Sequence, residues 1–358
     1  MSAVPAPDPG PDAGAIWHYG DPFGEQRSAQ TEAVLVDRSH RVVLTVRGAD
    51  RTTWLHTLCT QHVAEPPEGS STENLVLDSR GRITLHWVQT ELDGTTYLDT
   101  ESWLGESLAA HLRKMVFWAD VSIEPAGLAV LSLLGPGLAE PAVLAALGVA
   151  SLPDDAAMPV GSGGFVRRAP GGLGLDLLVP RDDITRWRDA LYRAGVRPAG
   201  VWTYEAERVA ACRPRIGVDT DERSIPHELN LIGGPGAGAV HLDKGCYSGQ
   251  ETVSRVHNLG KPPRMLVLLH LDGSADRPST GDPVSVGDRP VGRLGTVVDH
   301  FELGPIALAL LKRGLPADTA LLTGAGGEVS AVIDVDSMPP PDVRGAGRVA
   351  VDRLHGRV

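Results

Sequence analysis

The residues best suited to chemistry lie together in Lys244-Gly245-Cys246-Tyr247-Ser248-Gly249-Gln250-Glu251 (the 244–251 segment). Within it, the ammonium of Lys244 stands two positions before the thiol of Cys246. A nearby positive charge favours the thiolate and lowers the pKa of a cysteine from about 8.5. If Cys246 is partly exposed, this spacing predicts a nucleophilic or redox-sensitive cysteine. The alternative is that Cys246 only fills space in a tight turn beside Gly245.

A second short motif precedes that segment at Ile225-Pro226-His227-Glu228-Leu229-Asn230-Leu231, and a glycine-rich loop, residues 233–238, joins the two. The motif contributes Glu228 and Asn230, which we interpret either as ligand contacts or as support for the loop. No Lys-Ser or Lys-Thr pair follows the glycine-rich loop, so it lacks the P-loop pattern for nucleotide phosphates. We expect it to be a flexible connection rather than a binding loop.

Length and composition are those of a soluble globular protein with more than one domain. Of its 358 residues, 42% are hydrophobic and 22% are charged, which is typical of a soluble globular protein. A chain of this length is too long for one ordinary hydrophobic core. The formal net charge of −12 repels nucleic-acid phosphates at long range, so we expect no extended nucleic-acid surface. A local basic patch around Arg208, Arg213 and Arg215 is the alternative to an ordinary solvated helix end.

The three cysteines, Cys59, Cys212 and Cys246, are too few and too widely spaced for a disulfide framework. We expect Cys59 to be a small buried hydrophobe. No Cys or His spacing matches a zinc or iron–sulfur site, so no metal site is predicted. No apolar run reaches the roughly 18 residues of a membrane span, and residues 1–14 lack the apolar core of a signal peptide. These features predict a cytoplasmic protein whose residues 1–14 form a disordered tail.

Strands and helices are mixed up to about residue 260, as in α+β domains. Branched and alternating apolar residues predict strands at 34–36, 42–46, 75–77, 83–89, 95–99, 128–134, 165–166 and 175–179. Turn residues at 78–81, at Asp93-Gly94 and at 170–172 predict hairpins between neighbouring strands. Helices are predicted after the potential N-caps Asp50, Thr100 and Asp182 or Asp183, and over residues 204–211.

After Pro262, short strands separated by glycine-containing turns replace that mixture. They are predicted at 265–271, 283–286, 291–298, 306–311 and 329–335, with a final strand or tail at 348–354. Their regular spacing predicts a small β-barrel or sandwich. We therefore divide the chain into a disordered tail (1–14), a first α+β domain (15–125), a second α+β domain containing the 244–251 segment (126–260), a C-terminal β-barrel (261–336) and a linker with tail (337–358).

The 244–251 segment closely resembles the signature of the YgfZ group of folate-binding proteins, which are relatives of the glycine-cleavage T-protein. The resemblance covers residues 33–335: residues 34–50 are similar to the opening of the T-protein, 194–200 to its middle segment, and 281–283 with 291–293 to its C-terminal barrel. It implies an α+β, T-protein-like ring of three domains with a C-terminal β-barrel. It also implies that tetrahydrofolate or a derivative binds in the central hole, lined by the 244–251 segment.

Two departures from the T-protein bear on activity. The T-protein strand that carries an Asp pair in contact with folate corresponds here to Arg82-Ile83-Thr84-Leu85-His86-Trp87, which has no carboxylate. A Glu in a T-protein helix corresponds to Ala210. Without these acids, a protonation partner for the folate amine is missing. The resemblance therefore does not imply glycine-cleavage aminomethyltransferase activity.

The resemblance also suggests how side chains would bind a folate. Tyr247 would stack on the pterin ring and hydrogen-bond through its hydroxyl, unless it is an ordinary half-buried tyrosine. Gln250 and Glu251 would hydrogen-bond to pterin nitrogens. The alternative for Glu251 is a structural salt bridge to Lys244 or Arg255. A cation would anchor the glutamate tail of the folate, and the candidates are Lys244, Arg255 and Lys261.

The YgfZ group is linked to the maturation or repair of iron–sulfur proteins and, in bacteria, to tRNA-thiomodification enzymes that carry such clusters. The resemblance therefore implies a folate-binding protein that supports iron–sulfur proteins, or their assembly machinery, through Cys246. Two alternatives stay open. One is a folate-dependent one-carbon transferase, and the other is a non-catalytic scaffold for a cluster-carrying partner. Whether the protein turns over a substrate is not decided by the sequence.

Overall fold

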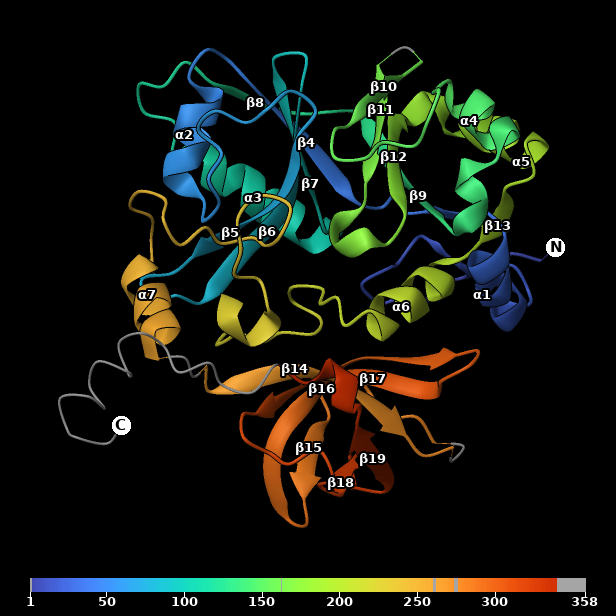
Figure 1. The fold of residues 1–358 in the computed structure, drawn as a ribbon, viewed down its shortest axis with the longest axis vertical. Coiled ribbons are helices and arrows are strands. Elements are labelled where there is room, and N and C mark those ends of the chain that lie inside the picture. Colours follow the sequence, from blue (N-terminus) through green and yellow to red (C-terminus); the bar gives the residue numbers. More distant parts are fainter. Residues whose placement is uncertain (1, 162, 260–261, 274–275, 340–358) are drawn as a thin grey trace. The chain divides into compact units, whose positions relative to one another are not determined.

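The chain folds into two compact units, each assembled from several stretches of sequence. The computed structural model describes residues 2–161, 163–259, 262–273 and 276–339 (Figure 1). The first unit comprises residues 1–57, 63–74 and 85–207, and the second comprises residues 58–62, 75–84 and 208–358. The 244–251 segment therefore belongs to the second unit, together with two short stretches that come from much earlier in the chain.

A five-stranded sheet in the order β5-β6-β7-β4-β8 lies largely in the first unit, except for residues 75–77 of β5 and 83–84 of β6 (Figure 1). Its strands are β4 (Val42–Arg47), β5 (Ser71–Leu77), β6 (Ile83–Leu92), β7 (Thr95–Thr100) and β8 (Ser122–Pro125), and the helices α2 (Arg51–Leu58) and α3 (Ser102–Lys114) follow β4 and β7. The turn between β6 and β7 has φ values of 49° at Asp93 and 69° at Gly94, the positive values that a two-residue hairpin turn requires. Both hairpins predicted for this region are confirmed, since β5, β6 and β7 are neighbours in the sheet.

A six-stranded sheet in the order β10-β11-β12-β9-β3-β13 forms the other layer of strands in the first unit. Its strands are β3 (Val34–Asp37), β9 (Leu128–Leu134), β10 (Met158–Val160), β11 (Gly164–Arg168), β12 (Leu175–Pro180) and β13 (Arg197–Ala199). Neighbouring strands are antiparallel except for β13 and β3, which are parallel. The helices of this region are α1 (Pro22–Thr31), α4 (Pro141–Leu147), α5 (Ile184–Arg193) and α6 (Val201–Ala210).

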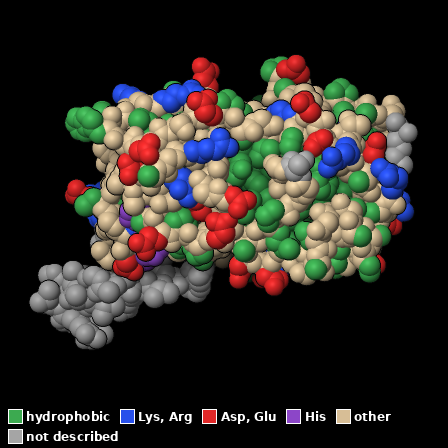
Figure 2. All heavy atoms as spheres, turned by 90° about the horizontal axis from the view of Figure 1, so that it is seen from above, with side chains coloured by type: hydrophobic (Ala, Val, Ile, Leu, Met, Phe, Trp, Pro, Cys, Tyr) green, Lys and Arg blue, Asp and Glu red, His purple; other side chains and the backbone are tan. Residues whose placement is uncertain are grey.

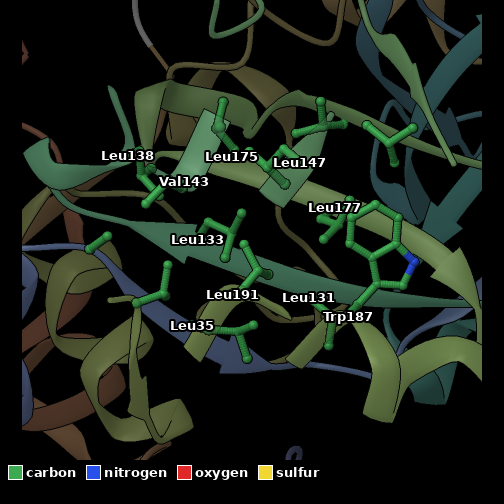
Figure 3. Packing of buried hydrophobic residues seen from close by; sticks show 14 of the residues in the cluster. Leu35, Leu131, Leu133, Leu138, Val143, Leu147, Leu175, Leu177, Trp187 and Leu191 are labelled. Atoms are coloured by element: carbon green, nitrogen blue, oxygen red, sulfur yellow. The ribbon is translucent and has the colours of Figure 1, made fainter. Parts of the chain in front are cut away.

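Alternate residues of this sheet form a hydrophobic core with helix α5 (Figure 3). Leu131 and Leu133 point from β9 into the core, and Trp187 and Leu191 reach it from α5, one turn apart as their spacing predicts. Trp187 is 6% exposed and Leu191 is 0% exposed. Each buried leucine contributes roughly 1.5–3 kcal/mol of apolar transfer free energy, so this core stabilises the sheet that it covers.

The C-terminal part of the second unit is a closed barrel in the strand order β14-β17-β16-β15-β18-β19, which confirms the predicted barrel. Its strands are β14 (Arg264–Leu271), β15 (Pro283–Val286), β16 (Arg289–His300), β17 (Gly304–Lys312), β18 (Leu321–Thr323) and β19 (Val329–Ile333). Met265, Val267 and Leu269 of β14 alternate into its core. Strand β18 was not predicted, because three residues are too few to show a period of two.

Two helical elements of the second unit carry the motifs identified in the sequence. The 3-10 helix η4 (Pro226–Leu229) contains the second motif, and α7 (Gln250–Leu259) begins inside the 244–251 segment. Helix η4 packs against both α7 and β14. The two motifs, which are separated in the sequence by the glycine-rich loop, are thereby brought side by side.

Several expectations about local structure are corrected. Where a disordered tail was expected, β1 (Val4–Pro5) pairs with β2 (Ile16–His18), because the backbone of this stretch finds partners such as Ala6 N to Ala15 O at 2.9 Å. Thr100 does not cap α3. Glu101 occupies the N-cap position, and the Thr100 hydroxyl donates to His86 O at 2.6 Å instead. The expected strand or tail at 348–354 and the candidate anchor Lys261 lie outside the described residues.

Around Arg208 and Arg215 the sequence predicted either a local basic patch or a solvated helix end, and the structure shows neither. Arg208 is 2% exposed and Arg215 is 5% exposed, and Arg208 Nη1 donates to Asp219 Oδ2 at 2.8 Å. These guanidinium groups therefore belong to the interior of the second unit.

Acidic and basic side chains are interspersed on the face shown in Figure 2. Within the described residues, no helix has both the length and the apolar character needed to cross a membrane.

Candidate functional site

The chain that leads into the 244–251 segment is tied to residues 58–62. The amide of Gln61 is 0% exposed and donates hydrogen bonds to Gly233 O at 3.0 Å and to Gly238 O at 2.8 Å. Beside it, His241 N donates to Thr60 O at 3.0 Å. One buried side chain thus closes the base of the glycine-rich loop that we expected to be a flexible connection.

Lys244 is buried at the start of the segment. It is 4% exposed, its Nζ donates to the backbone oxygen of Cys59, and the same atom lies 5.4 Å from the centre of the Tyr247 ring. Burial lowers the pKa of Lys244, while a carbonyl and an aromatic face both favour its charged form. These contacts link Lys244 to Cys59 and Tyr247, and its predicted effect on the Cys246 thiol stays a prediction.

The three free thiols differ in exposure. Cys246 is exposed, Cys212 is partly buried and Cys59 is 0% exposed. Burial raises the pKa of Cys59 to about 11, although the charge of Lys244 acts in the opposite direction. Burial also raises the pKa of Cys212 to about 11. Cys246 is therefore the thiol that an external molecule can reach, and Cys59 is the buried small hydrophobe that the sequence predicted.

Gly249 fixes the other end of the segment. Its φ is +79°, and a Cβ at this position would lie 2.5 Å from Asp78 O and 2.8 Å from Gly81 Cα. Only glycine fits such a close approach. Next to it, Gln250 begins α7 and donates from Nε2 to Lys244 O at 3.3 Å. With Lys244 and Gly249 both fixed, the segment presents Cys246 on a defined loop.

The remaining predicted ligand-binding residues of the segment occupy different environments. Tyr247 is 9% exposed, and burial raises the pKa of its hydroxyl to about 12, so the phenol is neutral at pH 7. Gln250 is partly exposed, whereas Glu251 and Arg255 are exposed on α7. In the part of the chain that the structure describes, neither Glu251 nor Arg255 forms an ion pair. Their charges are therefore accessible to a ligand or a partner.

Glu228 and Asn230, predicted either to contact a ligand or to support the loop, have observed local roles. Glu228 is 2% exposed, and its two carboxylate oxygens accept from Arg264 Nε and Nη2, both at 2.9 Å. Arg264 Nη1 also donates to Asp221 at 2.6 Å. Although burial opposes the effect, this hydrogen bonding lowers the pKa of Asp221 to about 2. Asn230 ends η4 in the left-handed region, with φ 55°, a conformation that asparagine tolerates well.

A histidine pair next to the segment was not predicted. The rings of His227 on η4 and His257 on α7 have centroids 6.1 Å apart. Both ring nitrogens of His227 are buried and have no hydrogen-bond partner among the described residues. Burial lowers the pKa of His227 to about 4, so its ring is neutral at pH 7. Each histidine stands in or beside a motif, but their pairing depends on how η4 packs on α7.

A buried charge network in the first unit was also missed. Asp99 on β7 accepts from Arg41 Nε at 2.8 Å and from Arg167 Nη2 at 2.5 Å, and Arg167 also pairs with Asp176 at 3.2 Å. Burial would raise the pKa of Asp176, but Arg167 and Arg38 hold it below its usual value. The network joins strands of the five-stranded and six-stranded sheets. Charged residues inside otherwise apolar strands were the signal that could have revealed it.

The strand that lacks an Asp pair has a carboxylate beside it. His86 Nε2 on β6 lies 3.1 Å from Glu73 Oε1 on β5, and the two side chains are 13% and 14% exposed. Sequence comparison along one strand could not detect this carboxylate, because it is contributed by the neighbouring strand. No group of three or more His, Cys, Asp or Glu side chains within the described residues is arranged to hold a metal ion.

The fold has a close structural counterpart. The glycine cleavage system aminomethyltransferase T from Bartonella henselae superposes with a TM-score of 0.81, covering 96% of this chain and 95% of its own, at 19% sequence identity. The fold is that of the glycine-cleavage T-protein. It is the α+β fold with a C-terminal β-barrel that the resemblance implied.

Several known proteins are similar to the chain in sequence at low identity. The chain is 28% identical to an aminomethyltransferase of Stenotrophomonas maltophilia over 269 residues, covering 70% of this chain and 71% of the relative. It is 26% identical to a chloroplastic protein of Arabidopsis thaliana named as a transferase, over 76% of this chain, and spans 65% of that protein's length. It is also 37% identical to the tRNA-modifying protein YgfZ of Aliivibrio fischeri over 113 residues, 30% of this chain and 33% of that protein. No profile of a known protein family matches the chain.

Proposed function

We propose that this protein binds tetrahydrofolate or a derivative and supports iron–sulfur proteins, or their assembly machinery, through Cys246, in the manner of the YgfZ group. The observation that carries the proposal is an exposed thiol on a segment fixed at both ends, by Lys244 and by Gly249. Supporting it are the T-protein fold and the partial similarity to a tRNA-modifying protein. The iron–sulfur partner in bacteria would include tRNA-thiomodification enzymes.

A fixed, exposed cysteine suits a reaction or a contact with a second molecule. Holding the thiol in place avoids part of the entropy cost of orienting it when a partner arrives. One cysteine cannot hold a cluster alone, because iron–sulfur clusters are held by several ligands. Cys246 would therefore act together with a folate-borne group, an external thiol or ligands of the partner protein. All three cysteines are free, as expected in the reducing cytoplasm that we propose as its location.

The proposed folate contacts are Tyr247, Gln250, Glu251 and Arg255. Arg255 and Glu251 offer exposed charges on α7, of which Arg255 suits the glutamate tail of a folate. Glu228 and Asn230 would act indirectly, because Arg264 holds the Glu228 carboxylate. In this proposal they shape η4, against which α7 packs.

A folate-dependent one-carbon transferase is the second candidate, and one observation favours it. The Glu73–His86 pair places a carboxylate and an imidazole 3.1 Å apart at the strand that lacks the Asp pair. Such a pair can accept and return a proton. Ala210, which replaces a T-protein glutamate, counts against aminomethyl transfer from the glycine-cleavage carrier.

Calorimetry with tetrahydrofolate tests the binding proposal. Wild type, Cys246→Ala and Arg255→Met would be measured side by side under anaerobic conditions. We expect wild type and Cys246→Ala to bind equally and Arg255→Met to bind more weakly. If wild type does not bind, the folate proposal is wrong and the scaffold alternative becomes the working hypothesis.

The role of Cys246 requires a separate readout in cells. Cells that lack this gene would be complemented with wild type, Cys246→Ser or Ser248→Ala, and the activity of an iron–sulfur enzyme and the level of thiomodified tRNA would be recorded. We expect Cys246→Ser to fail and the neighbouring exposed Ser248→Ala to complement. Full complementation by Cys246→Ser would overturn the thiol role. Loss of one-carbon transfer to tetrahydrofolate in Glu73→Gln, with binding intact, would instead support the transferase.

A further inference from the structure

His227 is unusual because, in the part of the chain that the structure describes, both nitrogens of its ring are buried and unpaired. Its side chain lies on η4, and both Nδ1 and Nε2 are shielded from solvent without a hydrogen-bond partner among the described residues. A neutral imidazole has one donor and one acceptor. Leaving such groups buried and unpaired costs roughly 1–3 kcal/mol each, and buried polar groups in proteins nearly always have a partner. The partner of this ring is therefore a species outside the chain, either an ordered water or a bound ion.

The neighbouring ring of His257 indicates what that partner is. The two centroids are 6.1 Å apart and the ring planes are inclined by 42°. Two imidazoles that bind one ion through nitrogens at about 2.1 Å place their ring centres roughly 5–6.5 Å apart. The observed separation falls in this range. His257 is exposed on α7, so a metal ion can reach this ring from solvent, whereas the nitrogens of His227 are shielded.

We propose that His227 and His257 bind one divalent transition-metal ion of the class that prefers imidazole, such as Zn²⁺, Co²⁺ or Ni²⁺. The ion bridges η4 and α7 and joins the two motifs that the sequence singled out. Two protein ligands leave the remaining coordination positions to water or to an external ligand. The proposal does not depend on the folate function and concerns a site separate from Cys246.

Glu228 is not available as a third ligand. Both of its oxygens accept hydrogen bonds from Arg264, and moving them to a metal ion would break these two charge-assisted bonds.

A second histidine pair in the same unit provides a contrast. The rings of His62 and His241 have centroids 5.6 Å apart, which is also compatible with a shared ion. However, His241 Nδ1 accepts a hydrogen bond from Asp243 N at 3.1 Å. In the neutral ring this places the proton on Nε2 and leaves no nitrogen free to bind a metal. This pair is therefore a matched control with similar spacing and a different prediction.

The experiment measures metal binding to the full chain without an affinity tag. Protein freed of metal with a chelator would be titrated with ZnCl₂ by calorimetry and with CoCl₂ by visible absorption at pH 7.5. The variants are His227→Asn, His257→Asn and His62→Asn. Because His257 is exposed, its substitution leaves the fold intact and keeps the test valid should His227→Asn unfold.

We expect one saturable site per chain in wild type and in His62→Asn. We expect His257→Asn and His227→Asn to bind at least roughly 10-fold more weakly, because even an outer partner of a metal ligand is typically worth that much. Absence of saturable binding in wild type would overturn the proposal. Wild-type affinity in His257→Asn, or loss of binding in His62→Asn, would overturn it as well, since the ion would then sit elsewhere.

Discussion

The ammonium of Lys244 and the backbone oxygen of Cys59 form a hydrogen bond between residues 185 positions apart in the chain. The bond lies in the interior, where Lys244 is 4% exposed and Cys59 is 0% exposed. It ties the start of the 244–251 segment to residues 58–62. Lys244 therefore has a positioning role that does not depend on any effect on the Cys246 thiol.

Replacing Lys244 by Met should destabilise the second unit. The variant leaves the Cys59 oxygen without this donor and loses the cation above the Tyr247 ring, so we expect a loss of roughly 1–3 kcal/mol in the free energy of unfolding. Urea unfolding followed by tryptophan fluorescence measures it. Arg255→Met, an exposed change on α7, should stay within about 0.5 kcal/mol of wild type. Equal stability of the two variants would show that the buried ammonium has no anchoring role.

The three cysteines should react with iodoacetamide at very different rates. Cys246 is exposed, whereas burial holds the pKa of Cys59 and of Cys212 at about 11. At pH 7.5 in the folded protein, mass spectrometry should find Cys246 modified first and Cys59 protected until unfolding. The fraction of Cys59 and Cys212 present as reactive thiolate should rise only as the pH approaches about 11, because a raised pKa keeps the proton on the sulfur below that pH. Early modification of Cys59 would contradict its burial.

Two glycines of the 244–251 segment should differ in their tolerance of alanine. Gly249→Ala puts a side chain at φ +79° and within 2.5 Å of Asp78 O. Strain of roughly 1–2 kcal/mol from the left-handed backbone adds to this clash, so both stability and tetrahydrofolate affinity should fall. Gly245→Ala meets no atom within 4 Å and should be close to neutral. Thermal unfolding and calorimetry on both variants test this, and equal effects would indicate that Gly249 is not a contact point.

Arg264 should contribute stability in a pH-dependent way. The pKa of Asp221 lies at about 2 in the folded protein against 3.8 when unperturbed. A carboxyl group with a lowered pKa stabilises the fold fully above the unperturbed value, and this stabilisation disappears as the pH falls from about 4 to about 2. Arg264→Met should therefore lose stability at pH 7, and the difference from wild type should shrink in acid. Asp221 accounts for roughly 1–2 kcal/mol of the stability difference at pH 7, after allowance for its partial exposure to solvent.

Urea unfolding at pH 7, 4 and 3 measures this dependence. Arg223→Met is the control, because Arg223 pairs with Glu222 at the surface, where the two side chains are 72% and 78% exposed. It should change stability little at any pH. A difference between Arg264→Met and wild type that grows on acidification would contradict the assigned roles of Arg264 and Asp221.

The sequence by itself determined those features that depend on neighbours along the chain. The hairpin turn at Asp93-Gly94, the helix that carries Trp187 and Leu191, and the strands of the C-terminal barrel follow from turn chemistry and from periods of two and 3.6. The resemblance of the 244–251 segment likewise pointed to the T-protein fold. Local order at residues 4–18 was missed, since its cause is pairing between two short strands of weak pattern.

Only the tertiary structure decided which side chains meet. The bond from Lys244 to Cys59, the Glu73–His86 pair and the approach of His227 to His257 each join different elements. The same holds for the burial of Arg208, which turned an expected surface cation into an interior one. Contacts of this kind depend on how elements pack, and packing reflects the sum of many small apolar and polar contributions. No spacing along one stretch of sequence records that sum.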